Sequence, residues 1–274
     1  MPTPVLSSQF PSAEAELYYE IYGDGPPLLL IAGLGSDSAS WQTAVPPLAK
    51  HFRVICLDNR GSGRSVCAEG PLSVDLMAED CAALIGHLGY EKTHVAGHSM
   101  GGFIAQRLAR VHPELVDRLV LSATGAKSSR RNVLLFSDLA RRLEEGEDPA
   151  RWFRTLFYWI YTPALFESDR ALAGALDFAL NYPWKQSPPF FRAQVEAIAA
   201  FDGREDLREI SVPALVLAGE RDLLFPPDEC REFAALLPKA KFKLLGGAAH
   251  SMHAENPRAF AVPVVEFLTE GDNQ

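Results

Sequence analysis

The fold is decided by residues 93–108, Thr-His-Val-Ala-Gly-His-Ser-Met-Gly-Gly-Phe-Ile-Ala-Gln-Arg-Leu. A short apolar run at Val95 and Ala96 leads into the glycine-rich residues 97–102, and apolar residues then recur with helical spacing. This order predicts a strand, a sharp turn and a helix. Small residues two positions before and after Ser99 keep the strand and the helix from colliding at such a turn. Ser99 would then present its hydroxyl beside the positive end of the helix, as in a nucleophile elbow.

Predicted strands and helices alternate along the rest of the chain. Strands are predicted at residues 17–22, 28–31, 53–57, 116–121, 214–218 and 241–245, and helices at residues 38–50, from Ser73 to Gly89 and at 257–268, the first interrupted near two prolines. Strands separated by helices indicate βα units, and therefore a mostly parallel sheet with helices on both faces. Ligands bind such sheets at the carboxyl ends of the strands.

The alternation of predicted strands and helices stops between residues 125 and 210, where no strand is evident and aromatic residues are frequent. Prolines divide this segment into short helices. We interpret it as a helical cap, inserted into an α/β core that comprises residues 1–124 and 211–274. The expected substrate pocket is mainly apolar, and its predicted lining residues are Trp152, Phe157, Trp159 and Leu223.

Three polar residues follow predicted strands and form a candidate catalytic triad: Ser99, Asp222 and His250. A serine hydroxyl is too weakly acidic to attack a carbonyl unaided, so His250 would take its proton and pass it to the leaving group. Asp222 would orient the imidazole and stabilise its charged form. The backbone amides of Leu34, which follows a glycine after the strand at 28–31, and of Met100 would form the oxyanion hole.

Other residues compete for two of these roles. His253 lies three residues after His250 and is a second candidate base, although the glycine-rich approach at residues 246–247 leads to His250. Glu220 and Asp206 are alternatives to Asp222. The remaining histidines lack the spacing of metal ligands, so we predict no metal site.

Composition narrows the classes of function. The chain has 274 residues and a formal net charge of −9, which argues against nucleic acid or an anionic membrane as a main partner. The polar loop at residues 58–65, Asp-Asn-Arg-Gly-Ser-Gly-Arg-Ser, lacks the features of a nucleotide-binding loop and is expected to be a tight loop beside the site. The four cysteines show no Cys-x-x-Cys spacing, and the first segment has no secretory pattern. We therefore predict reduced thiols and a cytoplasmic location.

Over residues 17–270 the chain resembles the α/β-hydrolase superfamily. The motifs that carry the resemblance are Ala32-Gly33-Leu34-Gly35, the loop at residues 58–65, Gly97-His98-Ser99-Met100-Gly101-Gly102, Gly219-Glu220-Arg221-Asp222 and Gly246-Gly247-Ala248-Ala249-His250. The chain is most similar to the enol-lactonase and aminoacrylate-hydrolase-like group of serine hydrolases, and the order serine, aspartate, histidine fits this architecture. Many relatives have a histidine where this chain has Ala32, so the hydrogen bonds of that histidine must be supplied by another group.

The resemblance and the residues together predict a serine hydrolase of carboxylic esters or lactones. We expect an acyl-enzyme intermediate, no cofactor and small apolar or aryl substrates. Alternatives that use the same triad are carbon–carbon bond hydrolysis and cofactor-free perhydrolysis, and a ligand sensor with a vestigial triad is a non-enzymatic alternative. A homodimer is left open as the oligomeric state.

Overall fold

The computed structural model describes residues 3–270, which fold around one nine-stranded sheet. Its strands run in the order β1-β2-β4-β3-β6-β7-β8-β9, and β5 pairs with β2. The strands are β1 (Leu6–Ser12), β2 (Ala15–Tyr22), β3 (Pro27–Ile31), β4 (Arg53–Leu57), β5 (Val66–Cys67), β6 (Thr93–His98), β7 (Val116–Ser122), β8 (Ala214–Gly219) and β9 (Ala240–Leu245).

Strands β3, β4 and β6 to β9 are parallel, whereas β1 and β2 add an antiparallel edge. The apolar run of β3 shows why the sheet is buried on both faces. Leu29 and Ile31 belong to one hydrophobic cluster, and Leu28 and Leu30 belong to another. Because successive side chains of a strand point to opposite faces, a continuous apolar run requires cover on both sides.

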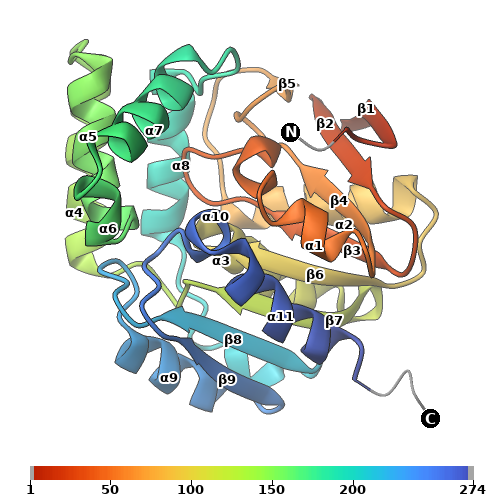
Figure 1. Ribbon diagram of the computed structural model, residues 1–274. Coiled ribbons are helices and arrows are strands. Elements are labelled where there is room, and N and C mark those ends of the chain that lie inside the picture. The colour runs from red at the N-terminus through yellow and green to blue at the C-terminus, as the bar shows by residue number, and fades with distance from the viewer. Residues whose placement is uncertain (1–2, 271–274) are drawn as a thin grey trace.

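Helices supply that cover (Figure 1). One face packs against α2 (Val74–His87), α3 (Met100–Val111) and α9 (Pro227–Leu236). The other face packs against the 3-10 helix η1 (Ser38–Trp41), α1 (Val45–Leu48), α10 (Met252–Glu255) and α11 (Pro257–Leu268). Two further 3-10 turns, η2 (Pro113–Leu115) and η3 (Leu207–Glu209), precede β7 and β8. The mostly parallel sheet with helices on both faces is thereby confirmed.

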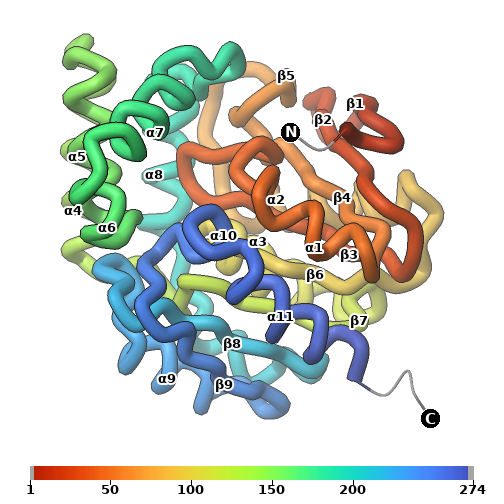
Figure 2. Tube along the Cα trace, in the orientation of Figure 1, coloured from red at the N-terminus to blue at the C-terminus, as the bar shows by residue number. Residues whose placement is uncertain are grey.

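Five α-helices fill the chain between β7 and β8, and we call residues 130–200 the helical insertion. They are α4 (Arg130–Glu144), α5 (Pro149–Ile160), α6 (Pro163–Phe166), α7 (Asp169–Asn181) and α8 (Pro188–Ala200). In Figures 1 and 2 these helices, coloured green to cyan, gather on one side of the molecule. Proline stands in the first turn of α5, α6 and α8, where its missing N–H costs no helical hydrogen bond.

Residues 38–50 differ from the predicted helix with an interruption near two prolines. They form η1 and the short α1, and the adjacent Pro46 and Pro47 lie within α1 instead of interrupting it. Proline is tolerated in the first turn, where a helix has unpaired N–H groups anyway. Strands β1 and β5 were also not predicted from the sequence. The first carries mostly polar residues, and the second is only two residues long.

Candidate active site

Ser99 occupies a strained turn between β6 and α3. Its φ of 54° lies in the left-handed region, and its ψ is −117°. The flanking glycines are required sterically, since a Cβ at Gly97 would lie 2.1 Å from the Gly101 carbonyl oxygen and one at Gly101 would lie 2.1 Å from that of Ile31. Hydrogen bonds from Ser99 N to Ser122 O (3.0 Å) and from Thr124 Oγ1 to Ser99 O (2.9 Å) fix the turn.

Two backbone amides beside Ser99 have no acceptor of their own. Within residues 3–270, neither Leu34 N nor Met100 N donates a hydrogen bond to another residue. Gly33 packs closely against the turn, because a Cβ built on it would lie 3.2 Å from Ser99 Cβ. The carbonyl of Ala32 accepts a hydrogen bond from Asn59 Nδ2 at 3.0 Å, so Asn59 braces the end of β3.

Asp222 and His250 are brought together at the ends of β8 and β9. His250 Nδ1 lies 3.0 Å from Asp222 Oδ2, and both residues are 4% exposed. The second carboxylate oxygen accepts hydrogen bonds from Leu224 N (2.8 Å) and Phe225 N (3.0 Å). Three hydrogen bonds therefore hold this carboxylate, and one of them joins it to the imidazole. In the described part of the chain, Ser99 Oγ makes no direct hydrogen bond to His250 Nε2; such bonds are often long in unliganded enzymes.

The competing residues are engaged elsewhere. Asp206 pairs with Arg107 at 2.9 Å, and Glu220 accepts a hydrogen bond from Gly247 N at 2.7 Å. The His253 ring lies between Trp41 and His98, with centroid distances of 4.5 and 4.4 Å. Burial, with a smaller effect of His250, lowers the pKa of His253 to about 3. A histidine with so low a pKa binds a proton only weakly. Without a carboxylate partner as well, it is a poor general base.

A cavity of about 650 Å³ lies between the helical insertion and the core. Its walls include Gly35, His98 and Ser251, which are the chain neighbours of Leu34, Ser99 and His250. Trp152 and Phe157 also line it, together with other apolar residues of α5 and α7. Trp159 and Leu223 do not line it: the Trp159 ring lies 5.7 Å from the Arg131 guanidinium carbon, and Leu223 is largely exposed.

One wall of the cavity is polar, and sequence reasoning missed its main residues. Tyr182, which follows α7, donates a hydrogen bond of 2.8 Å to Asp37 Oδ2, so the insertion contacts the core across the cavity. Burial raises the pKa of Asp37, and the nearby charge of Asp58 adds to this shift. The signal in the sequence was slight, namely one aspartate three residues after Leu34.

The insertion is also bonded to the loops that carry the candidate site. Ser251 N donates to Ile160 O at 2.9 Å, and Thr162 Oγ1 donates to Glu255 at 2.8 Å. On the opposite side, Gln194 Nε2 contacts Arg60 O (3.0 Å) and Ser62 Oγ (2.9 Å) in the loop at residues 58–65. That loop is therefore a brace beside the cavity, as its polar composition suggested.

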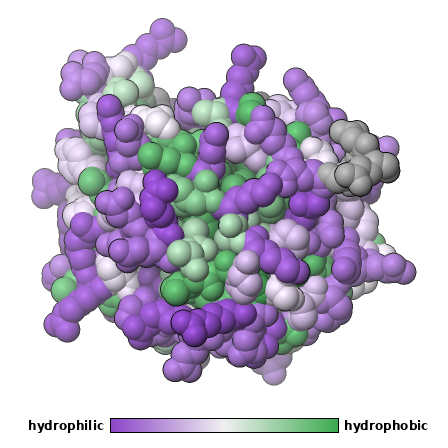
Figure 3. Space-filling model, turned by 90° about the horizontal axis from the view of Figure 1, so that it is seen from below, coloured by the Kyte–Doolittle hydropathy of each residue, from purple (hydrophilic) through white to green (hydrophobic). Residues whose placement is uncertain are grey.

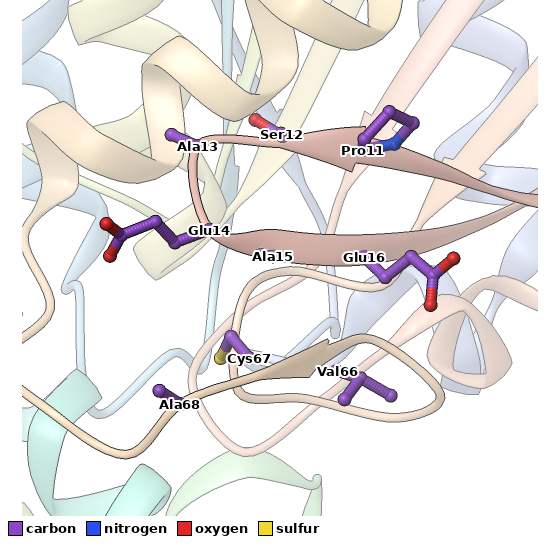
Figure 4. Close-up of a pocket in the computed structure, with 9 residues that line it drawn as sticks. All are labelled: Pro11, Ser12, Ala13, Glu14, Ala15, Glu16, Val66, Cys67 and Ala68. Carbon is purple, nitrogen blue, oxygen red and sulfur yellow. The ribbon is translucent and has the colours of Figure 1, made fainter.

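A second hollow, of about 510 Å³, lies on the β1–β2 hairpin beside β5 (Figure 4). It contains none of the predicted site residues. Its one sulfur atom belongs to Cys67, and burial raises the pKa of this thiol, so the reactive thiolate is disfavoured. We assign no chemistry to this hollow.

Residues 3–270 offer neither a metal-binding cluster nor a membrane-spanning helix. They contain no group of three or more His, Cys, Asp or Glu residues placed to hold a metal ion. No helix among them is both long and apolar enough to cross a bilayer.

Comparison with known proteins agrees with this architecture. The alpha/beta hydrolase fold family matches residues 26–257. The chain belongs to the α/β-hydrolase family. A family relative from Azorhizobium caulinodans, named "Putative carbamate hydrolase RutD", is 32% identical, covering 94% of this chain and 97% of the relative. Another from Mycobacterium tuberculosis, named "Putative non-heme bromoperoxidase BpoC", is 32% identical, covering 92% of this chain and 97% of the relative.

Among solved structures, the α/β-hydrolase chain is similar to the enol-lactonase from Burkholderia xenovorans. The two share 30% identity and a TM-score of 0.84, with 93% of this chain and 97% of the enol-lactonase covered. Membership of this family supports hydrolase activity, whereas the names of the relatives (carbamate hydrolase, bromoperoxidase and enol-lactonase) differ in reaction and in substrate.

Proposed function

We propose that this α/β-hydrolase is a serine hydrolase of carboxylic esters or lactones, with Ser99, His250 and Asp222 as its catalytic triad. The observation that carries the proposal is the buried 3.0 Å contact between His250 Nδ1 and Asp222 Oδ2. A carboxylate so placed keeps the proton on Nδ1, which leaves Nε2 free to accept one. Ser99, on its strained turn, is the nucleophile that this base would serve.

The reaction would proceed in two halves. Ser99 Oγ attacks the substrate carbonyl carbon while His250 Nε2 takes its proton, and the resulting oxyanion accepts hydrogen bonds from Leu34 N and Met100 N. Collapse of this intermediate breaks the bond to the alcohol oxygen, which receives the proton from His250. Water, deprotonated by the same nitrogen, then releases the acid from Ser99. No cofactor takes part in these steps.

The cavity supports apolar or aryl substrates of small size. Most of its wall on the insertion side consists of apolar side chains such as Trp152, Phe157 and Phe178. Its volume of about 650 Å³ falls within the ordinary range of small-molecule sites. We propose that residues 125–210 act as a cap that sets substrate range, while residues 1–124 and 211–274 supply the catalytic groups.

A carbamate is the second candidate substrate, favoured by the name of relatives that are 32% and 33% identical over more than nine-tenths of the chain. Its carbonyl carbon would be attacked by the same serine. A true carbamate hydrolase turns over p-nitrophenyl N-methylcarbamate continuously. An esterase would instead be carbamoylated at Ser99 and would stop after about one turnover.

The first test is intact-mass analysis after incubation with a fluorophosphonate, combined with p-nitrophenyl esters from acetate to decanoate. We expect one adduct on Ser99, measurable ester turnover and loss of both in Ser99→Ala, whose circular dichroism should match that of the wild type. An unlabelled but folded wild-type protein would contradict the proposal. Equal or better turnover of a dicarboxylate lactone would contradict the apolar substrate preference.

A further inference from the structure

His98 is the last residue of β6 and directly precedes Ser99. Its side chain is 6% exposed, and its Nε2 atom lies 3.0 Å from the backbone carbonyl oxygen of His250. This contact joins two positions that are 152 residues apart in the chain. It links the turn that carries the proposed nucleophile to the loop that carries the proposed base.

The protonation state of His98 follows from its partner. A carbonyl oxygen can only accept, so the proton of this hydrogen bond must reside on His98 Nε2. Burial, together with the neighbouring His253 and His250, lowers the pKa of His98 well below its ordinary value. The ring is therefore neutral near pH 7, and it serves as a donor of one fixed hydrogen bond.

Other hydrogen bonds of the His250 loop act on its neighbours. Arg221 N donates to Ala248 O at 2.8 Å, and Ser251 N donates to Ile160 O at 2.9 Å. Among the described side chains, only Asp222 and His98 hydrogen-bond to His250. The first orients the ring, and the second holds the main chain from which the ring projects. The two rings, His98 and His250, lie with their centroids 4.7 Å apart.

We propose that His98 is a positioning residue, which sets the His250 backbone at a fixed distance from Ser99 through its Nε2–H to carbonyl hydrogen bond. This inference rests on the proposed triad. A shift of the base by a fraction of an ångström lengthens the path of the proton between Ser99 and His250, and catalysis is sensitive to such misplacement. Substrate binding does not depend on that path.

The test compares three substitutions. His98→Leu removes the donor, and His98→Gln keeps an N–H donor at a similar reach. Gln106→Leu is the matched control, because Gln106 lies on α3, is 2% exposed and donates to two backbone carbonyls, those of Gly102 and Gly125, without contacting His250. With p-nitrophenyl acetate, we expect His98→Leu to lower kcat about tenfold.

His98→Gln should restore most of kcat, and Gln106→Leu should lose thermal stability while keeping kcat. Wild-type kcat in His98→Leu would overturn the proposal, as would equal losses in His98→Leu and His98→Gln. If His98→Leu does not fold, His98→Phe takes its place, since it keeps a ring and also lacks the donor.

A readout without turnover separates this inference from the proposed reaction. In protein labelled with ¹⁵N-histidine, the His250 Nδ1 proton bonded to Asp222 should exchange with solvent at least about tenfold faster in His98→Leu than in wild type or His98→Gln. Equal exchange in all three proteins would show that His98 does not position the base. Failure of fluorophosphonate labelling in wild type would instead contradict the proposed nucleophile.

Discussion

Ser99 and Asp222 are held by their surroundings in states that are unfavourable by themselves: a positive φ for Ser99 and burial of the carboxylate for Asp222. Ser99 adopts a positive φ, which costs a non-glycine residue on the order of 1–3 kcal/mol, and close packing of Gly97 and Gly101 maintains it. The Asp222 carboxylate is buried and receives hydrogen bonds on both oxygens. Such strain and burial are expected where a side chain is placed for chemistry instead of stability.

Asp222→Asn should lower kcat by about 10³-fold to 10⁴-fold with little change in fold. The asparagine oxygen can still accept from Leu224 N and Phe225 N, but its NH₂ group would face His250 Nδ1 and favour the tautomer with the proton on Nε2. That tautomer cannot take a proton from Ser99. Steady-state kinetics with p-nitrophenyl acetate measure the effect.

Glu220→Gln is the control for this prediction, because Glu220 bonds to Gly247 N and not to His250. It should keep kcat within about threefold of wild type. If Glu220→Gln were the more damaging change, the orienting carboxylate would have to be reassigned.

Predictability from sequence differed between elements. The turn at Ser99 was predictable because its constraints are local: small residues at fixed spacing around one serine. Strands β3 and β6 were predictable from apolar runs that must be buried. Strand β1 was not, since Phe10 is its only fully buried large side chain, and a polar edge strand has no distinctive pattern.

The polar contacts between elements were equally hidden from sequence. Tyr182 meets Asp37 across 145 residues, and Gln194 meets Ser62 across 132. Tyrosine, glutamine and serine have many partners in proteins, and only the packed tertiary structure selects one. The residues of the proposed triad could be named from the sequence because each follows a predicted strand, whereas the polar wall of the cavity could not.

Gln194 on α8 provides a test at the level of elements. Its side chain is fully buried and donates to Arg60 O and Ser62 Oγ. Gln194→Leu removes this buried donor from Arg60 O and leaves Ser62 Oγ with only its 3.2 Å bond from Gln186, so it should reduce the free energy of unfolding by about 1–3 kcal/mol, measured by urea denaturation.

The half-buried Gln186 offers a matched comparison, as its Nε2 bonds to Gly61 O and Ser62 Oγ in the same loop. Water can replace the lost donor there, so Gln186→Leu should reduce the free energy of unfolding by less than about 1 kcal/mol. Equal losses in the two variants would mean that burial does not decide the strength of this brace.

Two sets of buried groups change the stability of the protein in opposite directions as the pH changes. Burial lowers the pKa of His98 and His253, so the unfolded chain binds their protons more readily, and stability falls as the pH drops below about 6.5. Burial raises the pKa of Asp37 and Asp58, so the folded state binds their protons more readily, and stability falls as the pH rises through their folded pKa values.

His253→Phe should isolate one of these contributions. Between pH 6.5 and 5.5, we expect the free energy of unfolding of wild type to fall by about 1 kcal/mol more than that of the variant. Phenylalanine keeps an aromatic ring between Trp41 and His98 and cannot be protonated. Urea denaturation at the two pH values measures the difference, and parallel pH dependence in both proteins would contradict the shifted pKa of His253.

The surface of the molecule is mostly hydrophilic, but Figure 3 shows an apolar strip on the face seen from below. Exposed large apolar residues near the β9 edge are Leu236, Leu244 and Val262. Lys241 and Lys243 alternate with the apolar residues of β9, and an edge strand with lysines resists pairing with a second copy. Since Lys241 pairs with Glu270, Lys243 is the lysine that would oppose pairing of β9 with a second copy.

The hydrogen bond from Ser251 N to Ile160 O has a practical consequence for protein engineering. Swapping the insertion between related hydrolases is an attractive way to alter substrate range, because the proposed catalytic groups lie outside it. Here the last residue of α5 supports the main chain next to His250, so a transplanted insertion whose counterpart of α5 ends one turn earlier would leave that main chain unsupported. A chimera should therefore retain residues 157–162 of this chain, or it would change the base together with the pocket.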